Sequence, residues 1–260
     1  MSTQQTVTET AASETTPPAA WDPAALQGAY DALAPTLPGT VGVGVAAVGG
    51  DVVTTLGAWN SGVAWSTIKV PLAISALQQD PENAAGLASA AITVSDNAAA
   101  EQLWAMLGAG PDAATEVEAV LRDGGDVTTA VQAQRVRPEF TAFGQTDWSL
   151  AQQTLFTAHL PCLPEATAVL GLMSQISPDQ QWGLARIDGS ASKAGWGPGT
   201  DGSYLVRQLA VVPTGDGRTA VTLAAEPADG SFASGVAMLD QLEAWVQSNE
   251  SLLPSGRCAA

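Results

Sequence analysis

The order of strand-like and helix-like patterns along this chain restricts its possible folds more than any other feature of the sequence. A helix and two strands come first, a long helical section follows, and further strands and a last helix end the chain. Strands that flank one helical section can join in a single sheet. We therefore expect an α/β (α+β) fold with an antiparallel sheet, its terminal helices on one face and the helical section alongside.

The segment boundaries come from the periodicity and from turn residues. The first helix is expected at residues 23–34 and the last at residues 231–249. Two strands at about residues 41–48 and 51–58 flank the turn GGD. After Trp182 the segments with strand patterns are GLARID, SASKAGW, SYLVRQLAVV and RTAVTLAAEP.

This order predicts two lobes with a crevice between them. Residues 21–65 and 181–253 form a discontinuous α/β lobe, and residues 66–180 form a helical lobe. Residues 1–20 are rich in Ser, Thr and Pro and predict a disordered tether.

Charge and hydropathy exclude some partners. The net charge of -17 would repel nucleic acid, so we expect no nucleic-acid partner. No apolar run approaches the roughly 20 residues of a transmembrane helix. The start of the chain lacks the features of a signal peptide, which fits either a cytosolic protein or a chain whose export segment has been replaced by Met1. The Ser/Thr/Pro-rich leader favours the second interpretation. For the oligomeric state, we expect a monomer.

Neither of the two cysteines, Cys162 and Cys258, belongs to a cluster of His and Cys residues at metal-binding spacing. We predict a disulfide that holds the C-terminal tail, which implies an oxidising compartment. Two reduced, buried thiols are the alternative. The single histidine, His159, lies on a predicted helix without a partner, which argues against a Ser-His-Asp mechanism and against a histidine-rich metal site. We expect no metal and no cofactor.

Ser66 and Lys69 suggest nucleophilic catalysis without histidine. The chain has two lysines, Lys69 and Lys193, and the first lies in the apolar run AWSTIKVPL. A buried lysine can activate a serine because burial lowers the pKa of the ammonium. Side chains three residues apart at the start of a helix share a face, and backbone N–H groups there favour an oxyanion. In the alternative interpretation Ser66 caps a helix and Lys69 faces solvent.

Two further motifs supply what acyl transfer still needs. Ser95-Asp96-Asn97 provides a hydroxyl and a carboxamide, and Lys193-Ala194-Gly195 provides a second ammonium in a predicted strand. These groups suit a proton relay, a clamp on a substrate amide and a positive field for a carboxylate. Alone, each motif fits a helix cap or a strand edge. Together and in this order they are much more specific.

With these motifs the chain resembles the superfamily of class A beta-lactamases and penicillin-binding proteins, as a divergent member. That superfamily carries an SxxK, SDN and KTG trio. The order of elements is similar to the family fold from about residue 21 to 250. The resemblance implies a five-stranded antiparallel sheet flanked by N- and C-terminal helices, with a reduced all-helical lobe.

The resemblance also implies roles for the catalytic residues. Ser66 would be the acylated nucleophile, Lys69 its base or proton relay, and Ser95 the shuttle to the leaving nitrogen. Lys193 would bind a substrate carboxylate and tune Ser95.

Substrate binding would fall to neighbouring residues. Asn97 would hold the substrate side-chain amide, and the backbone N–H groups of Ser66 and of Trp196, which follows Gly195, would form the oxyanion hole. Ala194 stands where the family carries Thr or Ser, a hydroxyl that helps to hold the carboxylate. Arg207, or the loop GPGTDGSY, is a candidate to compensate, and a strand-edge charge is the alternative for Arg207.

Deacylation is the second departure from the family. Class A enzymes use a glutamate in an ExxLN loop, and the corresponding region here is RVRPEFTAFGQTDW. It offers Glu139 without the following Leu-Asn, as a possible deacylation base or as a surface charge. The stretch between Ser66 and Ser95 is also short, which would open the cleft.

We therefore expect a serine hydrolase or acyltransferase that forms an acyl-enzyme on Ser66 with an amide or ester. The substrate would be a small molecule or derive from peptidoglycan, such as a beta-lactam or a cell-wall peptide. The protein would be secreted or tethered to the cell envelope. One alternative is an envelope binding protein of the same fold without turnover, and another is a structural module in which neither lysine is shielded from water.

Overall fold

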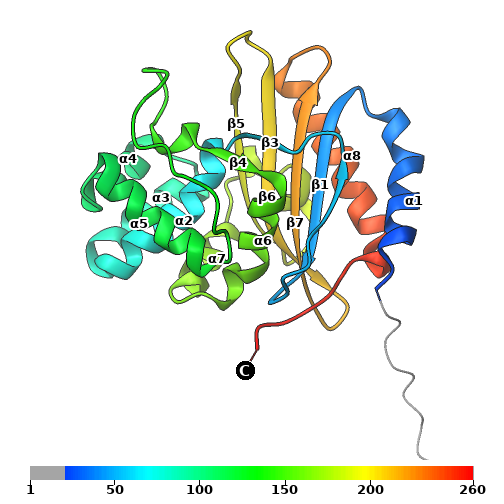
Figure 1. Cartoon of the computed structure of the whole chain (residues 1–260), viewed down its shortest axis with the longest axis horizontal. Helices are drawn as coiled ribbons and strands as arrows, with labels where there is room; N and C mark the ends of the chain where they lie inside the picture. The colour runs from blue at the N-terminus through cyan, green and yellow to red at the C-terminus, as the bar shows by residue number, and fades with distance from the viewer. Residues whose placement is uncertain (1–20, 260) are drawn as a thin grey trace, which may run out of the picture.

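A five-stranded antiparallel sheet forms the centre of the fold (Figure 1). The computed structural model describes residues 21–259, and the tether predicted for residues 1–20 lies outside them. The strands follow the spatial order β2-β1-β7-β6-β5. Their bounds are β1 (Gly39–Ala47), β2 (Thr54–Gly57), β5 (Ala191–Pro198), β6 (Tyr204–Thr214) and β7 (Gly217–Pro227). The predicted antiparallel sheet is confirmed, with β5 at one edge.

Helices α1 (Pro23–Leu33) and α8 (Phe232–Ser248) cover one face of this sheet (Figure 1). Asp22 caps α1 by accepting a hydrogen bond from the N–H of Ala24 at 2.9 Å, and Pro23 occupies the first turn. Apolar side chains of both helices join those of the strands in one buried cluster, which includes Leu26, Val43, Val206 and Leu242. Helix α6 (Leu150–His159) packs on the opposite face of the sheet.

The remaining helices pack around α2 beside the sheet (Figure 1). Nearly every residue of α2 is buried, because alanines on the neighbouring helices allow a close approach. These helices are α2 (Lys69–Gln79), α3 (Pro81–Thr93), α4 (Asn97–Met106), α5 (Gly110–Asp123) and α7 (Ala166–Met173). The exact division into lobes, at residues 65 and 181, stays a prediction.

Short elements account for the differences from the predicted segments. The predicted strand GLARID is wrong, because Gly183–Arg186 forms the 3-10 helix η6. There the N–H of Gly183 donates to Asp240 Oδ1 at 2.7 Å, and the next N–H donates to Gln208 Oε1 at 2.8 Å, so side chains replace ladder partners. A small ladder also joins β3 (Ser61–Val63) to β4 (Asp147–Ser149). The other 3-10 turns are η1 (Ala34–Thr36), η2 (Trp65–Ile68), η3 (Phe143–Gln145), η4 (Leu160–Cys162), η5 (Pro178–Gln180) and η7 (Glu250–Leu252).

The predicted disulfide between Cys162 and Cys258 is confirmed, with a Cα–Cα distance of 5.4 Å. It ties the C-terminal tail to the segment after α6, and the tail also pairs with the sheet where Arg218 faces Gly256. Within residues 21–259 no single helix has the length and hydropathy of a membrane span. Two consecutive helical segments have the length and hydropathy of a membrane span only when they are taken together, and they are bent by 112° relative to each other. They are Leu150–Cys162 and Ala166–Met173.

Candidate active site

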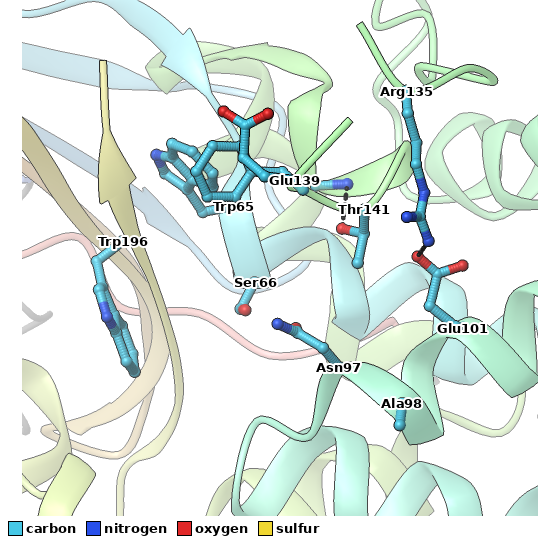
Figure 2. A pocket seen from close by; sticks show the side chains of 11 residues that line it. Trp65, Ser66, Asn97, Ala98, Glu101, Arg135, Glu139, Thr141 and Trp196 are labelled. Atoms are coloured by element: carbon cyan, nitrogen blue, oxygen red, sulfur yellow. Dashed lines mark hydrogen bonds and ion pairs between the residues drawn. The ribbon is translucent and has the colours of Figure 1, made fainter. Parts of the chain in front are cut away.

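Ser66 lies in the 3-10 turn η2, directly before α2. The backbone N–H of Lys69 bonds to the carbonyl of Ser66, and residues three apart in a 3-10 turn lie on the same face. Trp65 enters this turn with a φ of 51°, a left-handed conformation that is strained for a bulky residue. The turn therefore presents Ser66 and Lys69 on one side, and Figure 2 shows the Ser66 hydroxyl pointing into the cleft.

Lys69 is 1% exposed, which contradicts the solvent-facing alternative. Its Nζ donates to Ser95 O at 2.6 Å and to Asn97 Oδ1 at 2.7 Å, and lies 3.4 Å from Ser95 Oγ. Burial lowers the pKa of Lys69 to about 8, although the Asp96 carboxylate opposes this shift. Among the hydrogen bonds of the described chain, none joins Lys69 Nζ to Ser66 Oγ, so the amine rests on the SDN turn.

The SDN turn owes its shape to Ser95 and Asp96. Ser95 has a φ of 56°, and Asp96 caps α4 by accepting the N–H of Ala99 at 2.7 Å. With the central carboxylate used as a cap, Ser95 and Asn97 on either side turn toward Lys69. Asn97 points toward Ser66 across the cleft (Figure 2).

Lys193 reaches the same turn from the edge strand β5. It is fully buried, and its Nζ donates to Ser95 Oγ at 2.9 Å and to Ala194 O at 2.8 Å. Burial, and then the charge of Lys69, hold the pKa of Lys193 well below its ordinary value. The two lysines of the chain thus meet at one hydroxyl.

Gly195 allows β5 to contact residues 64–67, the turn that carries Ser66, which we call the nucleophile turn. A Cβ at this position would lie 2.8 Å from both Ala64 O and Ser66 N, closer than side chains tolerate. Only glycine therefore permits this approach, which places Trp196, the next residue, on the wall of the cleft that holds Ser66. The oxyanion hole formed by the N–H groups of Ser66 and Trp196 stays a prediction.

The cleft beside Ser66 has a volume of about 320 Å³. It is lined by aromatic, charged and small polar residues from η2, α4, β5 and the segment before β4, namely Trp65, Ser66, Asn97, Ala98, Glu101, Arg135, Glu139, Phe140, Thr141, Gly144 and Trp196. Trp65 also borders a second cavity of about 500 Å³, to which Gly197, Gly199, Asp201, Ser203 and Tyr204 of the GPGTDGSY loop contribute. Trp65 is thus a wall residue of both cavities.

Two carboxylates line the cleft, and each is paired with an arginine. Glu139, the predicted candidate base, is 57% exposed at its side chain and lies 3.2 Å from Arg137 Nε. Its carboxylate is turned away from Ser66 in Figure 2. Glu101, which sequence reasoning missed, bonds to Arg135 Nη2 at 2.8 Å. Its position one helical turn after Asn97 is the signal that could have revealed it.

Like Gly195, the predicted binding residues Ala194 and Arg207 do not line the cleft. Ala194 is buried in the cluster between the sheet and helices α1 and α8. Arg207 is fully buried, and its guanidinium donates to backbone carbonyls and to Gln153 rather than facing the cleft. Burial lowers the pKa of Arg207 to about 9, against the opposing charge of Asp147. His159 pairs with Asp51 at 2.9 Å, also outside the cleft.

The chain is similar in structure to solved class A beta-lactamases. The W229D mutant of the enzyme of the last common ancestor of Gram-negative bacteria is 19% identical, with a TM-score of 0.65 over 86% of this chain and 98% of that chain. The class A beta-lactamase from Mycobacterium abscessus is 17% identical, with a TM-score of 0.61 over 83% and 97%. The beta-lactamase from Streptosporangium roseum is 14% identical, with a TM-score of 0.65 over 88% and 100%. No protein-family model matches the sequence, and no curated protein matches it. The chain therefore has the fold of class A beta-lactamases.

Proposed function

We propose that this protein is a serine hydrolase or acyltransferase that forms an acyl-enzyme on Ser66 with an amide or ester. One observation carries the proposal: two buried lysines, Lys69 and Lys193, meet at the hydroxyl of Ser95, in the turn whose Asn97 lines the cleft with Ser66. A structural module has no need to bury both of its ammonium groups, because each burial is costly. Active sites commonly hold such lowered lysine pKa values.

The bond changes can be assigned to the groups of the site. Neutral Lys69 moves from the SDN turn to accept the proton of Ser66 Oγ, and this oxygen bonds to the substrate carbonyl carbon. When the bond to the leaving nitrogen or oxygen breaks, the leaving atom takes the proton of Ser95 Oγ. Lys69, now protonated, returns to the SDN turn, where its Nζ lies 3.4 Å from Ser95 Oγ in the structure, and gives Ser95 the proton that it took from Ser66.

Binding roles follow from the same geometry. Asn97 presents its amide toward the cleft while its Oδ1 accepts from Lys69 at 2.7 Å, so substrate binding and the base are coupled. The N–H groups of Ser66 and Trp196 would stabilise the oxyanion, supported by the contact of Gly195 with the nucleophile turn. When Lys193 is protonated, it would provide the positive charge that attracts a substrate carboxylate.

The substrate class and the compartment are narrower proposals. Solved proteins with this fold carry the name beta-lactamase, which favours a beta-lactam or a cell-wall peptide as substrate. The Cys162–Cys258 disulfide favours an extracytoplasmic location, because disulfides persist in oxidising compartments. We propose a secreted or envelope-tethered monomer.

Mass spectrometry after incubation with a fluorophosphonate and with a reactive beta-lactam tests the acyl-enzyme. We expect a single adduct on Ser66, absent in Ser66→Ala and retained in Ser61→Ala, a change at an exposed serine of β3. Absence of an adduct with every probe would refute the proposal.

The paired carboxylates favour a second candidate, an envelope binding protein that does not turn its ligand over. Glu101 and Glu139 each bond to an arginine, which weakens them as bases for deacylation. Steady consumption of nitrocefin or of a D-Ala-D-Ala peptide, stopped by Lys69→Ala, would exclude this candidate. A structural module without a reactive site would instead give Lys69 a measured pKa near the ordinary value of about 10.4.

A further inference from the structure

Arg207 is a buried cation that the proposed chemistry does not use. It lies in β6 directly opposite Gly195, the residue that contacts the nucleophile turn. Its side chain has no exposed surface, and no carboxylate within residues 21–259 forms a salt bridge with it. A buried guanidinium without an ion partner is costly unless its hydrogen bonds compensate.

The guanidinium holds three elements at once. Nη1 donates to Gly62 O at 2.9 Å and to Val63 O at 3.2 Å, in the strand that leads into the nucleophile turn. Nη2 donates to Trp148 O at 3.1 Å in β4 and to Gln153 Oε1 at 2.9 Å in α6. The planar fork of an arginine suits such a set of fixed acceptors, and a lysine cannot reproduce it.

Gln153 extends this network to the other side of Ser66. Its Nε2 donates to Thr67 Oγ1 at 2.9 Å, and this hydroxyl donates to Ala64 O at 2.6 Å. One cation thus fixes the chain just before Ser66 through two carbonyls and just after it through Gln153. The ring of Trp59, whose centroid lies 5.0 Å from the guanidinium carbon, provides a further contact with Arg207.

We propose that Arg207 is a positioning residue for the nucleophile turn, residues 64–67, and for the strand β3 that leads into it. Through its bonds to Gly62, Val63 and Gln153 it keeps the Ser66 hydroxyl and N–H in the geometry needed for attack. Its kinetic consequence rests on the proposed function of Ser66. Small displacements of a reacting group can reduce rates by about 100-fold.

The test compares Arg207→Met and Arg207→Lys with the full-length protein. Two experiments are run. Fluorophosphonate labelling of Ser66 gives the maximal rate and the half-saturating concentration, and hydrogen exchange is measured at the amides of residues 62–68. We expect Arg207→Met to lower the maximal rate by about 100-fold, with little change in half-saturation, and to speed exchange in this segment. Arg207→Lys should recover part of the rate, because its ammonium can still reach some of the acceptors.

Two further variants separate positioning from general destabilisation. Val211→Ala removes buried volume from the same strand without touching the network, and it should leave both the labelling rate and the exchange of residues 62–68 unchanged. Gln153→Leu removes the bonds of Gln153 to Arg207 and to Thr67 but keeps the bonds of Arg207 to backbone carbonyls in β3 and β4. It should also slow labelling, which keeps the test decisive if Arg207→Met does not fold.

Each outcome decides the proposal. Normal labelling and normal local exchange in Arg207→Met would refute it, as would equal effects in Arg207→Met and Val211→Ala. If the wild-type protein shows no labelling, the proposed function of Ser66 fails, while the exchange of residues 62–68 still decides whether Arg207 holds the turn.

Discussion

Lys193 Nζ lies 2.9 Å from Ser95 Oγ, and this hydrogen bond joins the edge strand β5 to the SDN turn. It crosses from the sheet to the helical side of the cleft. Ser95 is thereby held between two amines, since Lys69 Nζ lies 3.4 Å away. A hydroxyl in this position can pass a proton to a leaving group and be reprotonated at once.

Replacement of Ser95 by alanine should affect substrates according to their leaving group. An amide nitrogen must be protonated as it leaves, whereas the fluoride of a fluorophosphonate need not be. We expect Ser95→Ala to slow acylation by an amide or beta-lactam by about 100-fold to 10,000-fold, the usual range for general acid catalysis, and to slow fluorophosphonate labelling far less. Stopped-flow acylation with both reagents measures this difference. Equal losses with both reagents would contradict a proton-transfer role.

The pH dependence of acylation should follow Lys69. Its pKa is lowered to about 8 by burial, so the amine is charged below this pH and can accept the Ser66 proton only above it. The labelling rate should therefore rise with pH, about tenfold per unit below the midpoint, and level off above about pH 8. Lys69→Arg should abolish the rise because arginine stays protonated. A midpoint near 10.4, the ordinary lysine value, would contradict this assignment.

Much of the candidate site could be predicted because its motifs are local in sequence. The three-residue spacing of Ser66 and Lys69 already places both on one helical face, and Ser95 and Asn97 flank a residue that caps a helix. The sequence also singles out Lys193, but its link to Ser95 required the resemblance, since only the packing of β5 on the nucleophile turn brings the two together.

The errors arose where side chains from distant segments decide the local structure. GLARID has strand-like residues, but Asp240 and Gln208 bind its N–H groups and hold it as a 3-10 turn. The position of Arg207 depends on the β3–β4 ladder, in which each strand has three residues, too few for a readable alternation. Strand periodicity alone cannot tell which face of β6 will meet such a ladder.

Glutamine variants test whether either glutamate at the cleft releases the acyl group. Glu139 is largely exposed, paired with Arg137 and turned away from Ser66, so we expect Glu139→Gln to leave the half-life of the acyl-enzyme unchanged. Glu101→Gln is the matched variant, since Glu101 is paired with Arg135. Time-resolved mass spectrometry of the Ser66 adduct measures the half-life. A tenfold or greater lengthening in one variant would identify that residue as the base.

Reduction of the disulfide should lower stability without affecting the site. Cys162 and Cys258 are 96 residues apart in sequence, so their bond restricts a large part of the unfolded chain. We expect the double variant Cys162→Ser/Cys258→Ser to lose about 2–4 kcal/mol of unfolding free energy. Urea unfolding of the double variant, and of the unchanged protein with and without reductant, measures the loss. Labelling of Ser66 in the folded variant serves as the control. An unchanged unfolding midpoint would show that the bond adds nothing.

Alanine substitutions at Gly195 and Gly197 should both create steric clashes, but Trp65→Ala should relieve the clash only at Gly197. The Cβ of Gly197→Ala would lie 2.5 Å from the Trp65 ring, and we expect a cost of about 1–3 kcal/mol from overpacking. This cost should largely vanish when Trp65 is also replaced by alanine. In Gly195→Ala the Cβ would instead meet the backbone at Ala64 and Ser66, so Trp65→Ala should give no relief.

A double-mutant cycle from urea unfolding measures the coupling in both pairs, and fluorophosphonate labelling reports the effect on Ser66. We expect Gly195→Ala to reduce labelling by about 100-fold because it moves the nucleophile turn away from β5. Gly197→Ala in the Trp65→Ala background should label at the rate of Trp65→Ala alone. Equal costs of Gly197→Ala with and without the Trp65 ring would contradict the contact, and normal labelling of Gly195→Ala would show that the approach of β5 to Ser66 is not required for acylation.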